Sequence, residues 1–94
     1  MHILTYVDVI RGLTHQLDAK WREFGTFLHV QPAIMDGIGQ DRTNVGACML
    51  QLVEDWVVHK DGTGDLPRTW TTVVQAIQDM GEGPLAQQLT EQYI

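Results

Sequence analysis

The sequence contains no serine, one cysteine and only three prolines among its 94 residues. The missing serine excludes a serine nucleophile. A single cysteine, Cys48, excludes an internal disulfide and a zinc site with four cysteine ligands. No apolar run approaches the roughly 18 residues that a membrane span needs, and the N-terminal segment lacks the basic and apolar regions of a signal peptide. We therefore expect no membrane insertion, and a free cysteine fits a reducing, cytoplasmic location.

Basic residues are also scarce, because six Lys and Arg stand against twelve Asp and Glu, for a net charge of −6. They are scattered along the chain rather than grouped. A nucleic-acid binder needs a basic stripe that neutralises phosphates, so we expect no nucleic-acid partner, and anionic membrane surfaces are disfavoured for the same reason. The acidic balance favours a protein partner with a basic patch.

What the chain does contain is enough apolar material for one core. It is 44% hydrophobic and 19% charged, a composition that disfavours disorder. A chain of this length buries somewhat under two-thirds of its surface on folding, by roughly the scaling of small monomers. We expect one domain over residues 1–94.

Apolar residues recur every three or four positions in six segments, and none alternates with a period of two. In the second segment Asp18 is the expected N-cap, and Pro32 suits the first turn of the third. The expected inner stripes of these first three segments are Ile3, Tyr6, Ile10, Leu13 and Leu17; Trp21, Phe24, Gly25 and Leu28; and Ile34 and Ile38.

The strongest periodicity spans residues 44–60, and it places Glu54 and Asp55 on the outer face of a helix. A glycine-containing loop follows over residues 59–65. Thr69 is the expected N-cap of the fifth helix, and Pro84 begins the sixth. The expected inner stripes of these three helices are Val45, Cys48, Met49, Leu52, Val53, Trp56 and Val57; Trp70, Val73, Val74, Ile77 and Met80; and Leu85, Ala86, Leu89 and Tyr93.

Six amphipathic helices joined by short loops predict an all-α, antiparallel six-helix bundle. Tryptophans on inner stripes are expected to be core rather than binding residues, and Cys48 is expected to be inert packing. The predicted structural core is Trp21, Leu28, Leu52, Trp56, Trp70, Ile77 and Leu89.

Several motifs occur together in the order found in one known family. An apolar helix ends in Leu52-x-x-x-Trp56, a polar loop follows, and Thr69-Trp70 opens the next helix. Upstream stands the pattern Trp21-x-x-Phe24-Gly25-x-x-Leu28, and Pro84-Leu85-Ala86 opens the last helix. Together these motifs resemble the death domain, with Val73 and Ile77 in the place of two family leucines. The resemblance covers nearly the whole chain and implies the Greek-key arrangement of six helices.

The resemblance implies a function without catalysis or cofactor. Death domains bind other death domains, homotypically or heterotypically, to assemble apoptotic and innate-immune signalling complexes, often as helical oligomers of receptors and adaptors. One contact pairs helices one and four with helices two and three. A second pairs the end of helix four and the next loop with helices five and six, and a third uses helix three and its loops.

Charged side chains are the candidate docking residues on such surfaces. The acidic ones are grouped around the third helix and in the fourth loop, and the basic ones are complementary points on other segments. The candidate protein-binding residues are Asp36, Asp41, Glu54, Asp61 and Asp65, with Arg11, Arg22, Arg42, Lys60 and Arg68.

Other interpretations remain open at this stage. The four histidines never stand four residues apart, so a metal site is disfavoured, and surface positions or helix ends suit them better. The loop that begins at His59 lacks two key ligands of a calcium-binding loop, because His59 and Trp70 stand at its first and twelfth positions. The alternatives are a caspase-recruitment-like domain, an unrelated six-helix bundle, a purely structural domain within a larger protein, and a small enzyme or metal-binding bundle.

Overall fold

The computed structural model describes residues 4–94, and all regular structure in that range is helical. The helices in chain order are α1 (Tyr6–Leu13), the 3₁₀ turn η1 (Asp18–Lys20), α2 (Trp21–Phe27), α3 (Pro32–Asp41), α4 (Val45–Val57), α5 (Trp70–Asp79) and α6 (Gly83–Tyr93). The predicted all-α class and its six helices are confirmed. The predictions for His2 and Ile3 lie outside the described residues.

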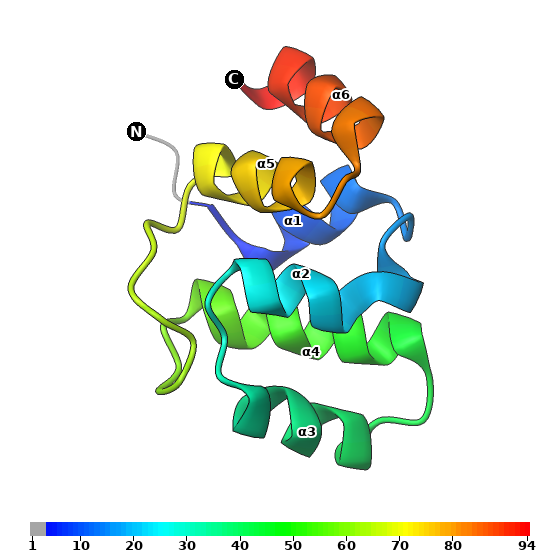
Figure 1. The fold of residues 1–94 in the computed structure, drawn as a ribbon, viewed down its shortest axis with the longest axis vertical. Helices are drawn as coiled ribbons and strands as arrows, with labels where there is room; N and C mark the ends of the chain where they lie inside the picture. The colour runs from blue at the N-terminus through cyan, green and yellow to red at the C-terminus, as the bar shows by residue number, and fades with distance from the viewer. Residues whose placement is uncertain (1–3) are drawn as a thin grey trace.

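Consecutive α-helices alternate in direction across the molecule (Figure 1). Helix α4 packs against α1, α2 and α3. Helix α2 also contacts α5, and α5 packs against α6. Each of these helices is too short to be stable alone in water, so packing of the apolar faces holds them.

Short polar side chains begin three of the helices. Thr5 forms a reciprocal capping box with Asp8 at the start of α1, and Asn44 Oδ1 accepts from the Ala47 N–H at 2.8 Å. Thr69 caps α5 as predicted. The prediction that Asp18 caps the second helix is wrong, because η1 intervenes and the Asp18 carboxylate instead bonds His15 Nδ1 at 3.0 Å.

Histidines stand at the ends of three helices, in the left-handed conformation where glycine is usual. His15, His29 and His59 have φ of 64°, 67° and 59° and follow α1, α2 and α4. After α4, the His59 N–H donates to the Trp56 carbonyl and the Lys60 N–H to the Asp55 carbonyl. This two-bond pattern ends α4 at Val57, three residues before the predicted end. The prediction that histidines stand at helix ends is confirmed for His15, His29 and His59.

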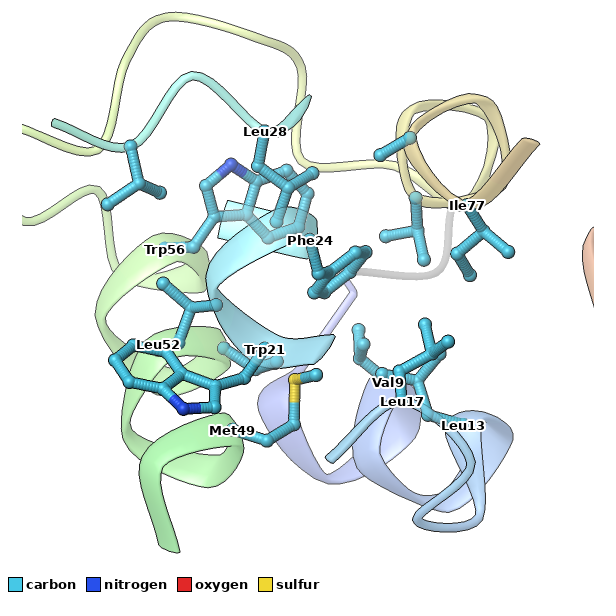
Figure 2. Packing of buried hydrophobic residues seen from close by; sticks show 14 of the residues in the cluster. Val9, Leu13, Leu17, Trp21, Phe24, Leu28, Met49, Leu52, Trp56 and Ile77 are labelled. Atoms are coloured by element: carbon cyan, nitrogen blue, oxygen red, sulfur yellow. The ribbon is translucent and has the colours of Figure 1, made fainter. Parts of the chain in front are cut away.

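The core lies where α2 and α4 meet α1 and α5 (Figure 2). Trp56, Phe24, Leu28 and Leu52 are completely shielded from solvent. Six of the seven predicted core residues are buried, namely Trp21, Leu28, Leu52, Trp56, Ile77 and Leu89. The seventh, Trp70, is half-buried and stacks on Tyr93 with ring centroids 4.1 Å apart.

The burial of three side chains, Tyr6, Val45 and Asp55, differs from the prediction. Tyr6 and Val45 are 38% and 46% exposed rather than inward. In helix α1 the residues that face inward are Val9, Gly12 and Leu13. The Gly12 position is so close to its neighbours that a Cβ there would lie 2.7 Å from the Trp70 ring. Asp55, expected on the outer face of α4, is only 6% exposed.

Candidate interaction surfaces

The ten predicted docking residues do not form one site. Arg22 on α2 and Asp36 on α3 bond each other, with Nη1 and Oδ1 2.9 Å apart. Glu54 is exposed on α4, and Asp61 and Asp65 are exposed in the following loop. The binding role of these residues remains a prediction, but the Arg22–Asp36 pair already neutralises part of the expected charge on the α2–α3 side.

Three of the ten, Asp41, Arg42 and Lys60, line one hollow of about 280 Å³ between α3 and α4. Its polar groups form a row. Arg42 Nη2 donates to Gln51 Oε1 at 2.7 Å, and Gln51 Nε2 donates to Asp55 Oδ1 at 2.7 Å. Lys60 Nζ lies 3.6 Å from Asp55 Oδ2 at the other end of the row.

Gln51 and Asp55 are site residues that the sequence reasoning missed. A signal was present, because Asp55 stands seven residues after Cys48 and three after Leu52, which is the spacing of one helix face. A charged residue at such a position, in an otherwise apolar row, indicates a buried polar group that needs partners.

Arg68 lies half-buried beneath the loop that joins α4 to α5. Its guanidinium stands 5.0 Å from the Trp56 ring centre. It donates to the carbonyls of Trp56, Gly64, Leu66 and Thr63, and to Thr63 Oγ1. Burial lowers the pKa of Arg68, and the nearby Asp65 charge opposes that shift. Arg68 therefore organises the loop that displays Asp61 and Asp65.

An exposed apolar strip runs along α1 and α4, and charge-based reasoning did not reveal it. Tyr6, Val7 and Leu50 are 38%, 43% and 40% exposed. They line a shallow groove together with Ile10, and Arg11 stands at its edge. A second apolar hollow continues from Ile10 and Leu50 over Leu13, Ala47 and Gly46, with Asp18 and Asn44 among its polar lining residues.

Residues 4–94 contain no group of three or more His, Cys, Asp or Glu side chains placed to hold a metal ion. Cys48 is 5% exposed inside the core. Over the same residues, no helix has the length and apolarity to cross a bilayer.

Comparison with known proteins gives no match, either to a family model, to a curated protein or to a solved structure.

Proposed function

We propose that this chain is a non-enzymatic protein-interaction domain of the death-domain kind, which assembles signalling complexes by binding other such domains. The observation that carries the proposal is the apolar strip of Tyr6, Val7, Ile10 and Leu50, edged by Arg11. Isolated exposed apolar residues are ordinary, but a contiguous group with a polar rim is typical of a docking surface.

The motif residues support the proposal through the structural roles they take. Leu52 and Trp56 are buried at the end of α4, and Thr69 caps the next helix. Gly25 lets α2 approach both α3 and α4, since a Cβ there would lie 2.6 Å from Met35 Sδ and 3.2 Å from Leu52. These roles suit the Greek-key death-domain fold that the resemblance implies.

The strip and a second surface can pair between two molecules. The strip presents apolar side chains and Arg11, whereas α2 and α3 expose Glu23 and Asp41. Two different surfaces that complement each other produce head-to-tail contacts, which do not close and can extend. We therefore expect a helical oligomer, with the charged groups setting partner choice and association rate and contributing part of the affinity.

Light scattering across protein and salt concentration tests the proposal. We expect the wild-type domain to grow into large species that dissolve at high salt, because salt screens the charges at the rim. Leu50→Glu, which places a charge in the strip, should remain monomeric. Gln88→Glu on the exposed side of α6 makes the same charge change outside the strip and serves as the control.

A wild-type domain that stays monomeric at every concentration would contradict self-assembly. Binding by a different death domain would then be the test, again with Leu50→Glu against Gln88→Glu. Equal binding by both variants would remove the strip from the proposal. No binding at all would favour a structural domain that packs within a larger protein.

A further inference from the structure

The hollow between α3 and α4 has a buried carboxylate at its base. The Asp55 side chain is 9% exposed. Its Oδ2 atom is shielded from solvent and has no hydrogen-bond partner among the described residues. Burying an ionised oxygen without a donor is costly, so this atom marks a place where a donor is missing.

The neighbouring side chains give this atom only a long ion pair. Gln51 Nε2 is bonded to the other oxygen, Oδ1, at 2.7 Å. Arg42 is turned to Gln51 Oε1 at 2.7 Å. Lys60 Nζ lies 3.6 Å from Oδ2, which makes an ion pair but exceeds hydrogen-bond distance. The Lys60 side chain is 54% exposed, so it is free to move out toward solvent.

We infer that this hollow receives the guanidinium of an arginine from a partner protein, which donates to Asp55 Oδ2 and displaces the Lys60 ammonium. That the arginine belongs to a protein rests on the proposed function. The binding of a guanidinium rests only on the hollow itself.

The lining of the hollow favours arginine over a simple ammonium ion. A guanidinium presents several N–H donors in one plane and is more weakly hydrated than an ammonium. Ala33, Ile34 and Ile38 give the hollow an apolar wall for the methylene stem of the arginine. Asp41, a second carboxylate among the lining residues, offsets the positive charge of Arg42, which also lines the hollow. An anion is disfavoured, because it would approach the Asp55 charge.

Chemical-shift titration of the ¹⁵N-labelled domain with blocked arginine (N-acetyl-arginine amide) tests the inference at constant ionic strength. We expect localised shifts at Gly37, Gln51 and Lys60. Blocked citrulline, which has nearly the same shape but no charge, should produce none of them. Lys60→Ala should bind the probe severalfold more tightly, because the internal competitor is gone.

The matched pair of variants is Asp55→Asn and Asp79→Asn, each of which removes one negative charge from the domain. Asp55→Asn should weaken binding of the probe at least about tenfold, since a charge-assisted hydrogen bond is lost. Asp79 is exposed on α5 and does not line the hollow, so Asp79→Asn should bind as the wild type does. Thermal melts establish that both variants are folded.

Three results would overturn the inference: no localised shifts in either the wild type or Lys60→Ala, equal shifts with citrulline, or equal weakening by both variants. The Lys60→Ala result decides the matter even if Asp55→Asn does not fold. The probe is a small molecule that binds to a single domain, so its binding does not require self-assembly. A failure of the proposed self-assembly can therefore be told apart from a failure of the inferred arginine binding.

Discussion

At the scale of single residues, Trp56 has the largest side chain among those fully shielded from solvent. It lies where α4 meets α2, next to Leu28 (Figure 2). Trp56→Ala should lower the free energy of unfolding by about 3–5 kcal/mol, because it removes a large apolar contact and leaves a cavity. Denaturant unfolding measures this loss. Val58→Ala, at a position 66% exposed, is the control and should change little; equal effects would show that the helix face is misassigned.

Alanine substitutions at Gly64 and Gly81 distinguish the cost of backbone strain from the cost of a steric clash. Both have positive φ, 77° and 87°, where a side chain is strained. A Cβ on Gly64 would also lie 2.9 Å from the His29 carbonyl oxygen, whereas nothing lies within 4 Å of one on Gly81. Gly81→Ala should cost about 1 kcal/mol, by the usual strain of that conformation. Gly64→Ala should cost clearly more in thermal or denaturant unfolding, and equal losses would contradict the contact.

At the scale of elements, the end of α4 offers a stabilising change. His59 is exposed and left-handed, with φ of 59°. His59→Gly should raise the free energy of unfolding by about 0.5–1 kcal/mol, because glycine adopts this conformation without the Cβ clash. His59→Ala keeps the clash and should give no gain. A thermal melt of the two variants compares them, and a higher melting temperature for the alanine variant would contradict the assignment.

The loop after α4 depends on the shape of Arg68 as well as on its charge. Its guanidinium reaches four carbonyls and one hydroxyl. Arg68→Lys keeps the positive charge but not the planar set of donors. We expect a loss of about 1.5–3 kcal/mol, the range for hydrogen bonds to a charged group, with faster amide exchange at Thr63 and its loop neighbours. Unchanged exchange would mean that the loop is held by its own turns.

The helices also show how much of the fold can be predicted from the sequence. Apolar spacing locates all six helices, because burial of one face is the main source of helix stability in a protein. Their ends are harder, since His29 and His59 take a conformation for which a glycine would be the signal. Side-chain direction is harder still. Val45 is exposed and Asp55 is buried, the reverse of their expected environments, because the burial of each position depends on which helices pack beside it. A one-dimensional stripe does not contain that information.

At the scale of the whole molecule, surplus negative charge should decide which partners are bound. Asp61 is exposed on the loop that Arg68 holds from beneath. Asp61→Lys should weaken partner binding and leave the fold unchanged, because the charge lies outside the core. Asp65 is less suitable, since its charge acts on Arg68. Circular dichroism and a binding titration check this together, and unchanged binding with an intact spectrum would remove Asp61 from the contact.

The three tryptophans occupy two kinds of electronic setting. Arg22 lies 4.7 Å from the Trp21 ring centre and Arg68 lies 5.0 Å from that of Trp56, while Trp70 is stacked on Tyr93. Each indole therefore adjoins a part of the surface where partners are expected. Opening of the loop would withdraw the Arg68 cation from Trp56, and docking at the α2–α3 side would disturb the Arg22 cation beside Trp21. The intrinsic fluorescence of single-tryptophan variants would thus follow assembly in real time, without an attached dye.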